Sequence, residues 1–239
     1  MRATLGFVAT ALLAIACGDS SSSSNPAPFD PDQTYDPDVS PDGLSLEITN
    51  DLSPAPVGAM WVFESVTADG TEHIEVTVTS ESKDIASGAT ARVVRDTAWF
   101  EGEMIEDTRD WFGQDADGNV WYLGEDTAEL ENGEVVSTEG SWIGGEDDAK
   151  PGILIPASPA VGVPYRQEYR PCEAEDMGEV IATSESVTVG GVTHDNCLHT
   201  RDTTPLEPDV QEDKFYCPGV GLVLTLEGDA REELVSMTP

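Results

Sequence analysis

The chain has 239 residues, with 47 acidic and 11 basic side chains and a formal net charge of −36 at pH 7. Such a charge repels polyanions and excludes binding to nucleic acid. Two interpretations of it stay open: hydration of the surface at high salt, and a role in binding cations. The even spread of acidic residues along the chain favours the first.

The N-terminus has the pattern of a secretory signal over residues 1–16. Arg2 precedes an apolar run that is too short for a stable transmembrane helix. The run ends in Ala14-Ile15-Ala16-Cys17, which resembles the bacterial lipobox. That resemblance implies that Cys17 receives a diacylglycerol and becomes the first residue of the mature protein. The alternative is an ordinary signal peptide with a coincidental cysteine.

The predicted location is extracytoplasmic. The one partner that the sequence predicts is the membrane, to which the Cys17 lipid would anchor the protein. Gly18 after the cysteine favours the outer membrane if the host is Gram-negative. Residues 17–43 contain a serine run and two Asp-Pro pairs with few apolar side chains, which predicts a disordered tether. Residues 44–239 then form a single β domain.

The β domain reads as consecutive hairpins. Glu72 to Thr79 alternates, with Ile74, Val76 and Val78 on one face. Asn132-Gly133 and Gly190-Gly191 are strong turn signals. Further strands are expected at 89–100, 104–114, 119–125, 127–130, 134–142, 163–170, 185–189, 192–200, 214–217 and 220–227.

Two segments have a different pattern. Residues 150–164 carry four prolines and suggest a crossover loop, and residues 173–180 have weak helical character. A 3.6-residue apolar stripe is absent from the sequence. About ten short strands with tight turns predict an all-β fold, an antiparallel meander that forms a barrel or a strongly curved sheet with at most one short helix.

Three cysteines remain besides Cys17, which allows one intramolecular bond and one thiol, or an intermolecular bond. Cys172 and Cys217 each lie beside a proline in a loop-like context, whereas Cys197 lies inside a strand pattern. A Cys172–Cys217 disulfide is therefore the favoured pairing of the three.

Residues 108–145 carry a family resemblance. The run from Asp110 to Glu125 reads DWFGQDADGNVWYLGE, and it resembles a family of uncharacterised secreted bacterial proteins with the pattern DW-aromatic-x-QDxxGNVWYxGE. Similar segments follow in order, so the resemblance spans most of residues 58–227. It implies a shared fold and an extracytoplasmic setting, and no activity. Cys172 and Cys217 replace small residues of the family, which supports a bond between them.

One candidate metal site is the turn that contains Asp115, Asp117 and Asn119. Its oxygen atoms suit calcium, but the glycine and the later acidic residues do not have EF-hand spacing. The competing interpretation is a hairpin turn whose polar side chains cap backbone groups.

A second candidate metal site is formed by His194, Cys197 and His199, which would suit copper or zinc. A strand places only residues 197 and 199 on one face. The favoured alternative is a buried cysteine between solvent-facing histidines. For the protein as a whole, no cofactor is expected.

Aromatic residues occur in adjacent pairs on neighbouring predicted strands. Alternation places the two members of a pair on opposite faces, so one face is core. The other face could form a platform for a sugar, lipid or peptide. The tryptophans of this platform are Trp99, Trp111, Trp121 and Trp142.

Signals for enzymatic activity are weak. The sequence has no G-x-S-x-G, phosphate-binding glycine loop or H-E-x-x-H motif. Glu168, Glu173, Glu175 and Asp176 could supply the carboxylate pair of a glycosidase, although such clusters arise by chance in an acidic chain. We therefore expect a non-enzymatic envelope lipoprotein with a ligand-binding or structural β domain. The alternatives are a hydrolase of an envelope polymer with paired carboxylates, and a calcium- or copper-binding module.

Overall fold

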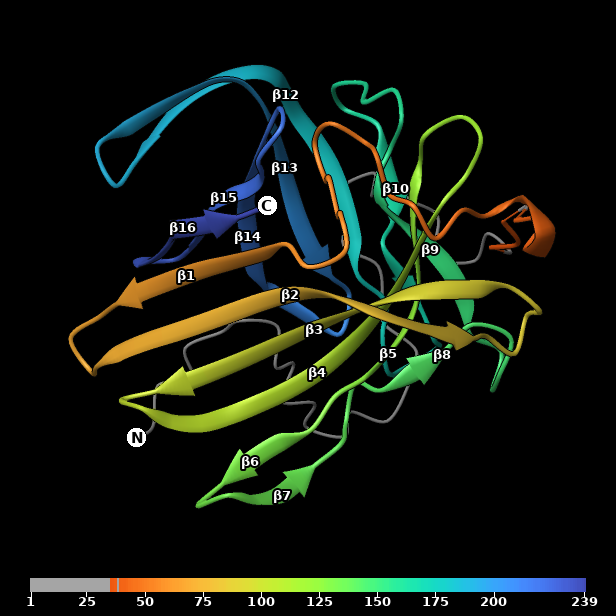
Figure 1. Cartoon of the computed structure of the whole chain (residues 1–239), viewed down its shortest axis with the longest axis horizontal. Coiled ribbons are helices and arrows are strands. Elements are labelled where there is room, and N and C mark those ends of the chain that lie inside the picture. Colours follow the sequence, from red (N-terminus) through yellow and green to blue (C-terminus); the bar gives the residue numbers. More distant parts are fainter. Residues whose placement is uncertain (1–34, 38) are drawn as a thin grey trace.

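A computed structural model describes residues 35–37 and 39–239 (Figure 1). The described part is all-β, with one short 3-10 helix, η1 (Pro41–Gly43). This confirms the predicted fold class. In that same part, no helix is long and apolar enough to cross a membrane. Cys17 lies outside the described residues.

In the described part of the chain, sixteen strands belong to one sheet, and every pair of neighbouring strands is antiparallel. The strands are β1 (Met60–Val66), β2 (Thr71–Asp84), β3 (Thr90–Phe100), β4 (Glu103–Gln114), β5 (Val120–Asp126), β6 (Glu129–Glu131), β7 (Glu134–Ser137), β8 (Trp142–Ile143), β9 (Lys150–Ile155), β10 (Pro164–Arg166), β11 (Glu168–Tyr169), β12 (Met177–Val189), β13 (Val192–Thr204), β14 (Glu207–Cys217), β15 (Gly221–Glu227) and β16 (Ala230–Thr238).

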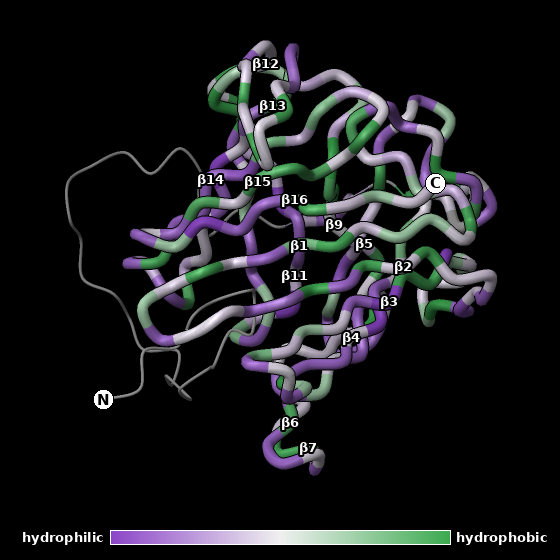
Figure 2. The backbone as a smooth tube through the Cα atoms, turned by 60° about the vertical axis from the view of Figure 1, so that its left-hand side comes forward, coloured by the Kyte–Doolittle hydropathy of each residue, from purple (hydrophilic) through white to green (hydrophobic). Residues whose placement is uncertain are grey.

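The sheet curves until its two ends nearly meet. Its order is β10-β12-β13-β14-β15-β16-β1-β2-β3-β4-β5-β9-β11, and the β6–β7 hairpin projects from the body (Figures 1 and 2). The terminal strands β10 and β11 are separated in the chain by Gln167 alone. One short segment therefore pairs with β12 on one side and with β9 on the other, which closes the barrel-like sheet.

Tight turns account for the meander. Asn132 and Gly133 have φ values of 53° and 77°, and Gly190 and Gly191 have 55° and 81°. Two successive positive φ values match the right-handed twist of the flanking strands, and Asn and Gly tolerate them best. The two predicted hairpins are confirmed.

The alternation predicted for β2 is also confirmed. Ile74 and Val78 are buried in the main core with Trp61 and Phe63 of β1. On the opposite face of the sheet, a second cluster contains Trp111, Trp121 and Leu123. Strands β3 to β5 therefore bury apolar side chains on both faces.

Strands β1 and β16 were not predicted, and two other segments have a different structure from the one expected. Lys150–Ile155 is strand β9, because Pro151 sits near the strand start and Gly152 and Ile153 pair with β5. In residues 173–180, expected to be weakly helical, a turn ends at Glu173, Ala174 forms an isolated bridge, and residues 177–180 are the first part of β12.

Part of the segment predicted as a tether contacts the β domain. Tyr35 donates a hydrogen bond from its hydroxyl to the Pro151 carbonyl (2.8 Å), and Asp36 pairs with Lys150 (2.6 Å). Val39 and Leu44 pack on the second cluster. From Tyr35 on, the described chain thus lies against the β domain; residues 17–34 lie outside the described part.

The predicted Cys172–Cys217 disulfide is wrong. Cys217 is bonded to Cys197, with 4.1 Å between the two Cα atoms. The register pairs Leu198 of β13 with Tyr216 of β14, so the two cysteines lie opposite each other on adjacent strands. Cys172 lies in an exposed turn before Ala174.

Candidate functional site

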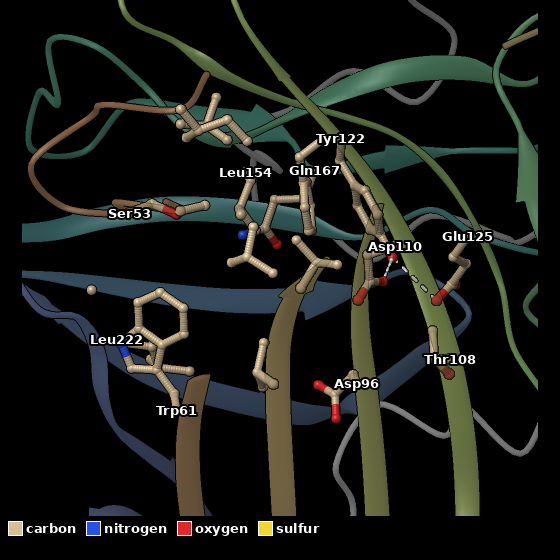
Figure 3. A pocket seen from close by; sticks show the side chains of 18 of the residues that line it. Ser53, Trp61, Asp96, Thr108, Asp110, Tyr122, Glu125, Leu154, Gln167 and Leu222 are labelled. Atoms are coloured by element: carbon tan, nitrogen blue, oxygen red, sulfur yellow. Dashed lines mark hydrogen bonds between the residues drawn. The ribbon is translucent and has the colours of Figure 1, made fainter. Parts of the chain in front are cut away.

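The curved sheet encloses a cavity of about 240 Å³ (Figure 3). Apolar side chains form one side, and Trp61, Leu154 and Leu222 lie there in Figure 3. Asp96, Asp110 and other polar side chains lie on the opposite side. The cavity is therefore amphipathic.

A loop that includes Ser53, Pro54 and Ala55 lines the cavity on its apolar side. Backbone contacts fix this loop, because the Gly219 N–H donates to the Asp51 carbonyl at 2.8 Å. Beside it, the Trp61 indole Nε1 donates to the Val220 carbonyl at 2.7 Å. Trp61 is thereby held with its ring against the cavity.

Ten carboxyl side chains gather in and beside the cavity, and we call them the interior acid cluster. Six line the cavity: Asp96, Glu106, Asp110, Glu125, Glu168 and Asp176. The other four are buried beside it: Glu72, Asp202, Glu212 and Glu232. Lys214 is the one basic residue among the described residues that line the cavity.

Strand alternation separates these acids from the charged outer surface. On β3, Arg95 points outward, and its guanidinium contacts the Asp107 carboxylate at 2.8 and 2.9 Å. The next residue, Asp96, points inward and lies between Val76 of β2 and Thr108 of β4. Neighbouring residues thus have opposite electrostatic environments.

Asp96 is 9% exposed, and its carboxyl makes no hydrogen bond or ion pair within the described chain. The nearby Thr108 hydroxyl is already engaged, with Glu106 at 2.8 Å and Thr127 at 2.6 Å. Burial, and then the neighbouring Asp110 and Glu106, raise the pKa of Asp96 well above its usual range. Burial and the neighbouring acids thus favour the protonated form of Asp96.

Tyr122 joins two acids of the cluster. Its hydroxyl oxygen lies 2.6 Å from Asp110 and 3.1 Å from Glu125. A hydroxyl has one proton, so the second hydrogen bond requires a proton on a carboxyl group. Burial, and then Glu168 and Asp110, raise the pKa of Glu125 well above its usual range, which supplies that proton.

Lys214 is the internal counter-charge of the cluster. Its Nζ lies 2.8 Å from Glu212 and 3.0 Å from Asp202. Burial lowers the pKa of Lys214, but these two carboxylates outweigh burial and hold it well above its usual range. Lys214 thus forms ion pairs with Asp202 and Glu212. The other eight acids of the cluster form no ion pair with a basic residue in the described part of the chain.

Of those remaining acids, Glu106 and Glu232 keep part of their protons near neutral pH, whereas the pKa values of Asp110 and Asp176 are raised by burial only to about 6. Burial, as the largest cause, raises the pKa of Glu106 to about 7 and that of Glu232 to about 8. Desolvation favours the neutral form of a buried acid, and neighbouring carboxylates add to this effect. The cavity can therefore exchange protons for another cation.

The candidate calcium loop is a hydrogen-bonded turn. Asp115 Oδ1 accepts from the backbone N–H groups of Asp117, Gly118 and Asn119 at 2.9–3.0 Å, and Oδ2 accepts from Asn119 and Trp121. Burial raises the pKa of Asp115, but these hydrogen bonds lower it further, so the net shift is downward. The carboxylate is already satisfied, as in the competing turn interpretation.

The candidate copper site loses its sulfur ligand, because Cys197 is bonded to Cys217. His199 instead stacks on Phe215, with ring centroids 4.4 Å apart, and its Nε2 lies 2.8 Å from Asp213. His194 lies further along β13, opposite Val187 of β12. Within the described residues, no group of three or more His, Cys, Asp or Glu side chains could hold a metal ion.

The predicted tryptophan platform is wrong. Trp111, Trp121 and Trp142 are 6%, 8% and 3% exposed, and the partly buried Trp99 lies 5.6 Å from the His73 ring. Alternation was predicted correctly, since Phe112 and Tyr122 line the cavity on the other face, stacked 4.8 Å apart. The second face is buried too, because Val39, Leu44, Ile85 and Ala89 pack around Trp111 and Trp121.

Of the four carboxylates considered for hydrolysis, two line the cavity and two lie outside it. Glu168 and Asp176 line the cavity, whereas Glu173 is exposed and Glu175 accepts the Cys172 N–H at 2.7 Å. Most of the interior acid cluster was missed. The available signal was parity: Asp96 shares a face with Val94 and Ala98, which are buried in the core.

No protein-family model and no curated protein matches the chain. Among solved structures, it is similar to the crystal structure of a "putative exported protein with YmcC-like fold" from Bacteroides fragilis. The identity is 16% and the TM-score 0.46, over 78% of this chain and 98% of that chain. It is also similar to a "putative lipoprotein" from Parabacteroides distasonis, at 14% identity and a TM-score of 0.40, over 79% and 99% of the two chains.

Proposed function

We propose that this chain is an extracytoplasmic lipoprotein whose β domain binds a small ligand in its cavity. The observation that carries ligand binding is the cavity of about 240 Å³, with Trp61, Phe63 and Leu222 along its apolar side. An engineered apolar cavity of about 150 Å³ binds benzene. The volume here has room for a ring or a short chain together with a polar group.

Calorimetric titration with 2-phenylethanol tests ligand binding. We expect saturable binding to the wild-type protein and loss of binding in Leu222→Trp, because the larger ring fills the cavity. Leu226→Trp is the matched control, since Leu226 lies on the same strand and packs against the separate cluster around Phe215. Absence of saturable binding to the wild type, or unchanged binding to Leu222→Trp, contradicts the proposal.

The lipid anchor rests on the sequence Ala14-Ile15-Ala16-Cys17. When the full chain is expressed in a bacterium, the wild type should enter the membrane fraction and incorporate labelled palmitate. Cys17→Ser should move the protein to the soluble extracytoplasmic fraction. If Cys17→Ser stays with the membrane, the anchor is not this lipid.

A further inference from the structure

We infer that the ligand is an organic ammonium ion with an apolar body, and that Asp96 binds its ammonium group. This inference rests on the proposed ligand binding in the cavity and names the class of ligand. It identifies Asp96 as the residue that sets specificity.

The first argument is the state of Asp96. Its side chain is 9% exposed, points into the cavity in Figure 3 and has no polar partner within the described chain. Its oxygen atoms are not among the fully buried atoms without a partner, so they face the open space of the cavity and can accept hydrogen bonds from a ligand. The donors that line the cavity near it are engaged elsewhere: Thr108 with Glu106 and Thr127, and Lys214 with Glu212 and Asp202.

The second argument is the row of side chains that faces the cavity across four strands. Trp61 of β1 is opposite Val76 of β2, Val76 is opposite Asp96 of β3, and Asp96 is opposite Thr108 of β4. All four line the cavity. Neighbouring strands lie about 4.8 Å apart, so the backbones at Trp61 and Asp96 are roughly 10 Å apart. An aromatic ring with a two-carbon link to an ammonium group spans the space between their side chains.

The third argument concerns the kind of cation. A bare metal ion would gain nothing from Trp61, Phe63 and Val76, and within the described residues no cluster could hold one. An ammonium group offers three donors to the Asp96 oxygens, while its apolar body buries against the opposite side. When it binds, the Asp96 carboxyl group releases its proton to water, and the carboxylate left behind pairs with the ammonium.

The charged groups that face Asp96 also favour a cation beside it. Asp110 and Glu106 of β4, Glu232 of β16 and Glu72 of β2 all act on it electrostatically, and each is acidic. Every one of these neighbours disfavours a lone carboxylate at position 96 and favours a cation beside it.

The test compares two probes of the same size, 2-phenylethylammonium and 2-phenylethanol, by calorimetry on the purified full chain near pH 7.5. We expect the ammonium to bind the wild type about tenfold more tightly or better, as for a hydrogen bond to a charged group. Asp96→Asn should remove this advantage and leave alcohol binding within about twofold. Asp126→Asn, at an exposed position of β5, is the control and should match the wild type.

The outcomes separate the two proposals. Equal affinity for alcohol and ammonium in the wild type, or full ammonium affinity in Asp96→Asn, overturns the inference and leaves ligand binding standing. Failure of both probes to bind the wild type overturns ligand binding and the inference with it. The wild-type comparison needs no variant, so the result does not depend on how Asp96→Asn folds.

Discussion

Glu232 provides a test of the buried acids through stability. It is 6% exposed on β16, and burial, followed by Glu72, raises its pKa to about 8. An acid whose folded pKa is raised contributes stability that is fully present below the unfolded pKa, near 4.5, and is lost as the pH rises through about 8. Between about pH 5 and pH 8 the free energy of unfolding should fall by about 1.4 kcal/mol per pH unit from this group, or about 4 kcal/mol in total.

In Glu232→Gln the side chain cannot ionise, so this fall in the free energy of unfolding with rising pH should disappear. Urea unfolding of the full chain, followed by tryptophan fluorescence at several pH values, gives the free energy of unfolding of each protein. The variant should gain on the wild type steadily across this pH range. Glu134→Gln, at an exposed position of β7, should follow the wild type and accounts for general surface repulsion. Parallel pH curves for the wild type and Glu232→Gln would refute the assignment of a buried neutral acid.

Three further predictions concern the disulfide, the closure of the sheet and ligand binding. Peptide mapping without reduction should join Cys197 to Cys217, and Cys197→Ser should cost about 3 kcal/mol of stability; a Cys172–Cys217 peptide would contradict the strand register. Gly152→Ala would place a Cβ 2.1 Å from the Gln167 carbonyl oxygen, so it should lower thermal stability by about 1–3 kcal/mol; an unchanged melting temperature would argue against closure there. Affinity for 2-phenylethylammonium should rise with pH over the range in which Asp96 of the free protein keeps its proton, by up to about tenfold per pH unit for one released proton. Calorimetry in two buffers of different ionisation enthalpy counts that proton, and a pH-independent affinity would contradict proton exchange.

The fold was largely predictable because its signals are local. Period-2 alternation in β2 and the Asn132-Gly133 and Gly190-Gly191 turns specify strands and hairpins without long-range information. Ala230–Thr238 was missed because β16 directs Glu232 inward, so its pattern lacks an apolar face. β9 was missed because the four prolines of residues 150–164 suggest a loop, although the one proline inside the strand, Pro151, is compatible with a strand start.

The site was less predictable because it depends on strands that are distant in the chain. Parity placed Asp96 on the face of Val94, but only the closed sheet brings it near Glu232 of β16. The tryptophan platform failed for a related reason. The cluster that contains Trp111 is covered in part by Val39, which belongs to the segment predicted as tether.

The central claim is that the cavity binds an organic cation at Asp96. A crystal structure of the protein with 2-phenylethylammonium tests it most directly. The account predicts the ammonium nitrogen within about 3 Å of an Asp96 carboxylate oxygen and the ring beside Trp61. A ligand bound outside the cavity, or one whose ring lies against Asp96 with the ammonium turned toward solvent, would contradict it.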